Sequence, residues 1–184
     1  MNDLTTMDTE QVASGEDIEG IVLHLIRLLG DRRLTLSVAE SCSGGLLAKL
    51  LTDVAGSSSY FLAGVVAYSN AAKSAFLGVS PALIERKGAV SAEVAAAMAE
   101  GVLRRSGSDI ALSVTGIAGP DGGTTEKPVG TVYLGLADSH GCNTMLLGLS
   151  GSRDQIRSAS ARNALDWATR HISSTAPATS KGHI

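Results

Sequence analysis

The chain has 184 residues and is 44% hydrophobic, which is enough to bury the core of one domain. Its net charge of -3, with no basic run, and its 3% aromatic content argue against a nucleic-acid-binding surface. Two cysteines make no disulfide framework, and no apolar run is long enough for a membrane span. Because the N-terminus is polar and acidic rather than a signal peptide, we expect a cytoplasmic protein.

The hydrophobic pattern predicts strands and helices in alternation. In chain order we expect a helix over 17–29, a strand over 34–38, a helix over 45–53, a strand over 64–68, helices over 70–77, from 81 and over 91–105, and a strand over 110–115. A Gly-rich loop over 116–128 follows, then a hairpin of strands 129–137 and 142–149, and a last helix over 153–171.

This order predicts the α/β class, as a three-layer sandwich with a mixed β-sheet. No internal repeat or linker divides the chain, so we expect a single domain. Its bounds are predicted as a disordered N-terminal segment over 1–15, a folded domain over 16–173 and a flexible tail over 174–184.

The segment over 38–47 combines an apolar strand end, a small polar loop and the start of a helix. In α/β proteins, such a loop presents backbone N–H groups and a helix N-terminus to one point, where anions bind. Its candidate nucleophiles and flanking glycines are Ser41, Cys42, Ser43, Gly44 and Gly45. The structural alternatives are hydroxyls that cap the helix and a cysteine that fills the core.

Histidine chemistry is disfavoured by where the histidines fall. None lies in a Gly-rich loop or beside a Ser, Cys or acidic cluster, and no pair has metal-ligand spacing; they are His24, His140, His171 and His183. This pattern argues against a Ser-His-Asp triad and against a metal site. We expect surface histidines, and neither a metal nor a cofactor.

A lysine offers a base that needs no histidine. Lys73 lies about one helical turn beyond Tyr68, which ends an apolar strand. Desolvation or neighbouring cations can lower a lysine pKa enough for general-base work, and Ser–Lys pairs are an established way to activate a hydroxyl. Tyr68 could orient the lysine or relay a proton. The alternative is an exposed lysine on a helix surface.

Two further segments suit an anionic ligand. The strand ending at Thr115 is followed by Gly116 and Gly119, where glycines let the backbone approach a ligand closely and donate N–H groups. No Gly-Lys-Ser/Thr follows, so this is not a P-loop. Arg153 begins a helix, where the helix dipole disfavours a cation. Such an arginine either serves an anionic ligand or is simply exposed.

Six segments, taken together, are similar to motifs of one known family: AESCSGG at 39–45, YSNAAK at 68–73, GAVSAEV at 88–94, VTGIAGPDGG at 114–123, EKPVGTVY at 126–133 and SGSRDQIR at 150–157. On these residues the chain resembles the CinA C-terminal domain family over about 18–171, and it looks like the stand-alone form of that domain. The resemblance implies a single α/β sandwich that assembles as a homodimer.

The resemblance also implies an amidase that converts nicotinamide mononucleotide to nicotinate mononucleotide and ammonia. It assigns Ser41 as nucleophile, Lys73 as base and Tyr68 as orienter or relay. Loop N–H groups near 42–45, or at Gly116, would hold the oxyanion. The residues implied to bind the substrate are Cys42, Ser43, Gly44, Gly45, Thr115, Gly116, Gly119 and Arg153, the last of these for the phosphate.

Two departures from the family pattern leave points open. The family usually has an Asp where this chain has Ser152, which bears on how Arg153 is oriented. It often has Thr at Ser43, so this second hydroxyl remains a rival nucleophile to Ser41. Two other functions also stay open: a non-catalytic nucleotide-binding or regulatory module, and a Ser/Lys amidase that acts on another carboxamide.

Overall fold

A computed structural model describes residues 17–175, so the expectations for 1–15 and for 176–184 lie outside the described residues. One five-stranded sheet has the strand order β2-β1-β3-β4-β5. The parallel strands are β1 (Leu36–Glu40), β2 (Phe61–Val66) and β3 (Ile110–Gly116), and the antiparallel pair is β4 (Thr131–Asp138) and β5 (Gly141–Gly148). The predicted mixed sheet is confirmed.

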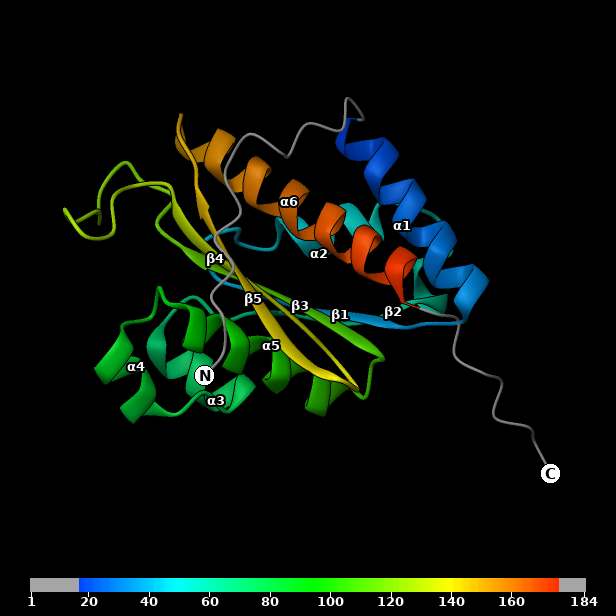
Figure 1. Cartoon of the computed structure of the whole chain (residues 1–184), viewed down its shortest axis with the longest axis horizontal. Coiled ribbons are helices and arrows are strands. Elements are labelled where there is room, and N and C mark those ends of the chain that lie inside the picture. Colours follow the sequence, from blue (N-terminus) through cyan, green and yellow to red (C-terminus); the bar gives the residue numbers. More distant parts are fainter. Residues whose placement is uncertain (1–16, 176–184) are drawn as a thin grey trace.

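Helices cover both faces of this sheet (Figure 1). On one face lie α1 (Ile18–Arg32), α2 (Leu46–Thr52) and α6 (Arg153–Ser174), and on the other α3 (Asn70–Leu77), α4 (Pro81–Lys87) and α5 (Ala92–Ser106); a short 3₁₀ helix, η2, spans Ser57–Ser59. Each face has its own apolar core, since Leu25, Val38 and Leu165 belong to the first and Leu77 and Met98 to the second. These are the three layers that the sequence predicts.

Helix ends follow local sequence signals. The Ser91 hydroxyl accepts a hydrogen bond from the Val94 N–H at 3.3 Å and so begins α5. At the start of α6, Ser152 and Gln155 form a reciprocal capping box. Ser152 therefore caps this helix at the position where the family usually has an acid.

Two strands are displaced from their predicted ranges. β1 runs to Glu40 because this residue still pairs with β2 and β3, although an acid usually ends an apolar run. β2 begins at Phe61 and ends before Ala67. Beyond it, the carbonyl groups of Ala67 and Tyr68 turn toward Lys73 instead of a neighbouring strand. Buried polar contacts override the apolar pattern at both places.

The carboxyl ends of β1, β2 and β3 meet at one edge of the sheet. After β1 the chain enters α2 on one face, whereas after β2 it enters α3 on the opposite face. Ligand sites of open α/β sheets form at such a switch point, outside the carboxyl ends of the strands. The residues just beyond these three strands are therefore in the position where a ligand site is expected.

Candidate active site

A tight turn follows β1 and carries Ser41. The Ser41 N–H donates to the Val114 carbonyl at 2.9 Å, and the Gly44 N–H donates to the Ser41 carbonyl at 3.1 Å. Gly44 and Gly45 have φ angles of 64° and 93°. An L side chain is strained in this left-handed region, so the two glycines allow the chain to reverse into α2.

Glu40 holds the far side of this turn from within the fold. Its carboxylate is fully buried and accepts N–H groups of Gly45 at 3.0 Å, Leu47 at 3.0 Å and Ala48 at 2.8 Å. A carboxylate is favourable at a helix N-terminus because it meets the orphan N–H groups and the positive end of the dipole. These amides are thus already occupied, and the Gly45 N–H is not available to an oxyanion.

Lys73 reaches the turn from α3. Its side chain is 1% exposed, and its Nζ lies 2.9 Å from Ser41 Oγ, 3.0 Å from the Ala67 carbonyl and 3.4 Å from the Tyr68 carbonyl. Within residues 17–175, no ion pair joins it to a carboxylate. Burial lowers the pKa of Lys73, although the nearby Cys42 acts in the opposite direction.

The three neighbours of this amine match what a general base requires. A neutral amine has two N–H groups, which the carbonyls of Ala67 and Tyr68 can accept, and one lone pair, which the Ser41 O–H can meet. Once protonated, the ammonium has three N–H groups for the same three oxygens. The site therefore holds Lys73 in both protonation states without rearrangement.

The other two candidate nucleophiles differ from Ser41. Burial raises the pKa of the Cys42 thiol to about 11, and this outweighs the opposing effects of backbone N–H groups and of Lys73. A thiol of this kind is protonated near neutral pH and is a poor nucleophile. The Ser43 hydroxyl is fully buried and has no hydrogen-bond partner among residues 17–175. Of the three side chains, only Ser41 is hydrogen-bonded to Lys73.

Tyr68 and Arg153 meet at the outer side of the site. Arg153 donates through Nη2 to the Tyr68 hydroxyl at 2.9 Å and through Nη1 to the Gly119 carbonyl at 2.7 Å. The Tyr68 side chain is 60% exposed, and its hydroxyl bonds Arg153 rather than Lys73. Its contact with the lysine is made by its backbone carbonyl, so the expected orienting contact is a main-chain one.

These groups line one cavity of about 290 Å³. Of the predicted residues, it is lined by Ser41, Cys42, Tyr68, Lys73, Thr115, Gly116, Gly119 and Arg153. Ser43, Gly44 and Gly45 do not line it, because Glu40 and α2 draw this part of the turn away. The Thr115 hydroxyl is occupied, since it donates to the Ala89 carbonyl at 2.8 Å.

Sequence reasoning did not single out four residues that the structure places at or beside the site. Asn70 and Asp121 line the cavity. Glu40 and Arg157 lie outside the lining and form hydrogen bonds to the backbone of the turn that carries Ser41. All four lie inside the motifs that carry the family resemblance. Their place in these motifs is the sequence feature that could have marked them as site residues. Among residues 17–175, no group of three or more His, Cys, Asp or Glu side chains is arranged to hold a metal ion.

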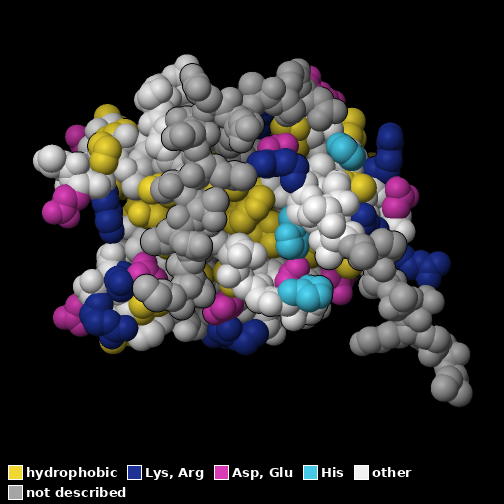
Figure 2. Space-filling view, viewed as in Figure 1, with side chains coloured by type: hydrophobic (Ala, Val, Ile, Leu, Met, Phe, Trp, Pro, Cys, Tyr) yellow, Lys and Arg dark blue, Asp and Glu magenta, His cyan; other side chains and the backbone are white. Residues whose placement is uncertain are grey.

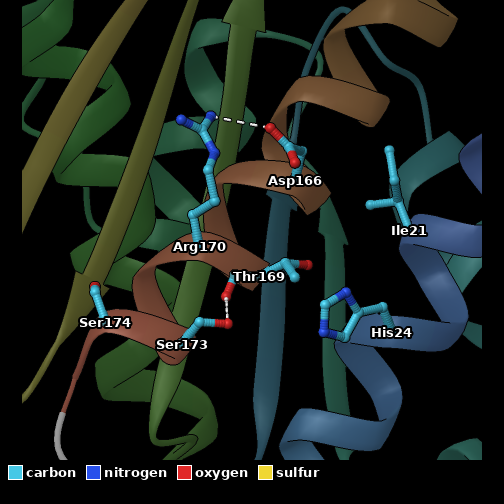
Figure 3. A pocket seen from close by; sticks show the side chains of 7 residues that line it. All are labelled: Ile21, His24, Asp166, Thr169, Arg170, Ser173 and Ser174. Carbon is cyan, nitrogen blue, oxygen red and sulfur yellow. Dashed lines mark hydrogen bonds and ion pairs between the residues drawn. The ribbon is translucent and has the colours of Figure 1, made fainter. Parts of the chain in front are cut away.

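A second cavity, of about 510 Å³, lies between α1 and α6 (Figure 3). Its polar side chains are largely satisfied within α6: Asp166 pairs with Arg170 at 3.0 Å, the Thr169 hydroxyl donates to the Leu165 carbonyl, and Ser173 donates to the Thr169 carbonyl. None of the predicted site residues lines it. The smaller cavity is therefore the candidate active site.

Comparison with known proteins identifies the family. A family model of the CinA C-terminal domain matches residues 19–172. The chain belongs to the CinA C-terminal domain family. A CinA-like protein of Geobacter sulfurreducens is 55% identical over 161 residues, which cover 88% of this chain and 38% of that protein. The chain thus spans less than half the length of this relative.

Solved structures of the CinA family have the same fold. The competence/damage-inducible protein CihA of Agrobacterium tumefaciens has a TM-score of 0.82 at 41% identity, over 86% of this chain and 96% of that one. A CinA superfamily protein of Escherichia coli has a TM-score of 0.82 at 33% identity, over 90% of this chain and 95% of that one. The predicted fold class and family are confirmed.

The charge distribution on the surface and the character of the helices are relevant to binding of nucleic acid and to membrane insertion. On the face seen in Figure 2, Lys and Arg side chains lie scattered among acidic and neutral ones rather than in one continuous stripe. Over residues 17–175, none of the helices has both the length and the apolar character that a membrane crossing needs.

Proposed function

We propose that this chain is an amidase that hydrolyses the carboxamide of nicotinamide mononucleotide to nicotinate mononucleotide and ammonia. The observation that carries the proposal is the Lys73–Ser41 pair, in which a buried amine lies 2.9 Å from a hydroxyl in a cavity. No carboxylate among residues 17–175 forms an ion pair with this amine. Membership of the CinA C-terminal domain family is compatible with this activity. We also propose that the protein forms a homodimer, as the family resemblance implies, and that it is cytoplasmic and needs no cofactor.

In the first half of the reaction, Ser41 Oγ attacks the amide carbon while its proton passes to Lys73 Nζ. The new C–O bond pushes the carbonyl electron pair onto oxygen, which forms a tetrahedral oxyanion. When this intermediate collapses, the C–N bond breaks and the Lys73 ammonium donates its proton to the leaving nitrogen. Ammonia departs, and an ester on Ser41 remains.

In the second half, water hydrolyses that ester. The neutral Lys73 takes a proton from the attacking water, a second oxyanion forms, and its collapse returns the proton to Ser41 Oγ. The product is the carboxylic acid, which loses its proton to solvent and leaves as the carboxylate. Both halves need the same amine in both protonation states, which the contacts of Lys73 with Ala67, Tyr68 and Ser41 allow.

The oxyanion needs N–H donors that are not already in use. The Gly44 N–H donates to the Ser41 carbonyl, and the Gly45 N–H donates to Glu40. On the other wall, the Ile117 N–H donates to the Thr131 carbonyl at 2.9 Å. We therefore propose that the oxyanion is held by the N–H of Cys42, the residue that follows the proposed nucleophile and lines the cavity. The N–H of Gly116, which lines the same cavity, is the alternative donor.

Arg153 is the proposed phosphate ligand. It lies at the cavity, and its hydrogen bonds to the Gly119 carbonyl and the Tyr68 hydroxyl leave other guanidinium N–H groups for an anion. In this arrangement Tyr68 positions Arg153 rather than relaying a proton to Lys73. The side-chain hydroxyl and the backbone carbonyl of Tyr68 thus support two different parts of the site.

The test is ammonia release from nicotinamide mononucleotide by wild type, Ser41→Ala and Cys42→Ala. We expect turnover by wild type and Cys42→Ala, and none by Ser41→Ala. Nicotinamide, its riboside and an unrelated carboxamide serve as comparison substrates. Folded wild-type protein that binds the nucleotide without releasing ammonia would point to a non-catalytic module, and release from the unrelated amide alone would point to a different amidase.

A further inference from the structure

We infer that Arg157 is a positioning residue for the proposed hydrolysis, because it fixes the turn that presents Ser41 to Lys73. Arg157 lies in the second turn of α6 and does not line the cavity. It acts through the backbone of Ser43, two residues beyond the proposed nucleophile. This inference rests on the proposed function, because its kinetic consequence is defined by the Ser41–Lys73 chemistry.

The contact is made by two donors of one guanidinium. Arg157 Nε lies 3.1 Å and Nη2 2.9 Å from the carbonyl oxygen of Ser43, a residue 114 positions away in the chain. The side chain is 30% exposed, and a Cβ built on Gly44 would lie 3.4 Å from Nη2. Two donors of one rigid guanidinium meet at this oxygen, so they hold its position more firmly than a single donor would.

The turn is held from two sides, and Arg157 supplies one of them. From inside the fold, the Glu40 carboxylate accepts the N–H groups of Gly45, Leu47 and Ala48. On the outer side, the Ser43 carbonyl has the 3.3 Å bond from the Leu46 N–H and the two bonds from Arg157. The Ser43 hydroxyl adds no hydrogen bond to this support, because it has no partner in the described part of the chain. Loss of Arg157 would leave the outer side of the turn weakly held.

The same helix also carries Arg153, four residues earlier and therefore on the same side of α6. Arg153 lies at the cavity and Arg157 behind the turn, so α6 couples the proposed phosphate ligand to the proposed nucleophile. Because Arg157 has no place in the cavity lining, its loss should disturb the 2.9 Å approach of Ser41 to Lys73 more than it disturbs substrate binding.

The kinetic test compares Arg157→Gln, Arg157→Lys and wild type with nicotinamide mononucleotide as substrate. We expect kcat of Arg157→Gln to fall about 10- to 100-fold while KM stays within about threefold, because a misplaced catalytic group costs rate rather than binding. Arg157→Lys keeps a cationic donor and should retain part of the wild-type kcat. Addition of guanidinium ion to Arg157→Gln should also restore part of kcat.

Arg170→Gln is the matched control. Arg170 also lies on α6 and forms an ion pair with Asp166 at 3.0 Å, but it lines the other cavity. It should keep the wild-type kcat. Equal kcat in Arg157→Gln and Arg170→Gln would overturn the inference, as would a rate loss in Arg157→Gln that appears wholly in KM.

Hydrogen exchange provides a second readout that needs no turnover. In Arg157→Gln, peptides that cover the turn over 41–46 should exchange about tenfold faster than in Arg170→Gln, while the sheet keeps its protection. If the wild type releases no ammonia, the proposed function fails and exchange alone decides about Arg157. Unchanged exchange in the turn would then overturn the inference, and faster exchange would support it.

Discussion

The inner end and the mouth of the 290 Å³ cavity contrast in burial and in charge. At the inner end, Ser41 and Lys73 are 8% and 1% exposed, and backbone carbonyls surround the amine. At the mouth, Tyr68 is 60% exposed and Arg153 is exposed as well. Desolvation lowers a lysine pKa only where water is excluded, whereas a guanidinium stays charged in water. The proposed function thus places bond-breaking at the inner end and recognition of an anion at the mouth.

Removal of the nucleophile should have the largest effect at the inner end. Ser41→Ala should lower kcat for nicotinamide mononucleotide by about 10⁴-fold or more, as for other activated serines. Ammonia release measures the loss, and thermal unfolding checks the fold. Binding of the nucleotide should survive, because Arg153 lies at the mouth. Turnover within tenfold of wild type would remove Ser41 from its proposed role.

The proposed role of Lys73 as the base at the inner end predicts a specific pH dependence of kcat/KM. Lys73→Gln should lower kcat by about 10³-fold, within the range of lost general-base catalysis. In the proposed mechanism the neutral amine of Lys73 is the active form, and burial lowers the pKa of this amine. Consequently kcat/KM should be low in acid, rise with pH through the lowered lysine pKa and then level off. A flat profile from mildly acidic to alkaline pH would contradict this assignment.

At the mouth, the expected effect is on binding. Arg153→Gln should raise KM for nicotinamide mononucleotide about 10- to 100-fold with a small change in kcat, because a charge-assisted contact to the phosphate is lost. Rates with nicotinamide riboside, which lacks the phosphate, separate this from a general defect. The variant should lose its preference for the phosphorylated substrate, and a preference that persists would place the phosphate elsewhere.

The smallest effect on kcat is expected at Ser43, whose hydroxyl is the alternative nucleophile to that of Ser41. Ser43→Ala should keep kcat within about twofold, because the Ser43 hydroxyl makes no hydrogen bond to Lys73 and Ser43 does not line the cavity. Its thermal midpoint should stay or rise, since an unpartnered buried hydroxyl costs about 1–3 kcal/mol. Loss of activity as deep as that of Ser41→Ala would exchange the roles of the two serines.

Local patterns predict the order and class of the elements because they depend on neighbours in the chain. The helical spacing of apolar residues over 91–105 and the capping signal of Ser91 predict α5 almost to the residue. Strand ends are predicted less well. Glu40 extends β1 because its carboxylate meets α2 amides, and an acid in a sequence gives no sign of such partners.

The sequence by itself determined the α/β class, the family and the residue types of a Ser–Lys site without histidine. Only the tertiary structure decided which groups meet. It brings Ser41 to Lys73 across 32 positions and turns the Tyr68 hydroxyl to Arg153. It also places Arg157 against the Ser43 carbonyl, in the turn that carries Ser41. The physical reason is that periodicity encodes which side chains are buried, whereas the partner of a buried polar group depends on how distant segments pack.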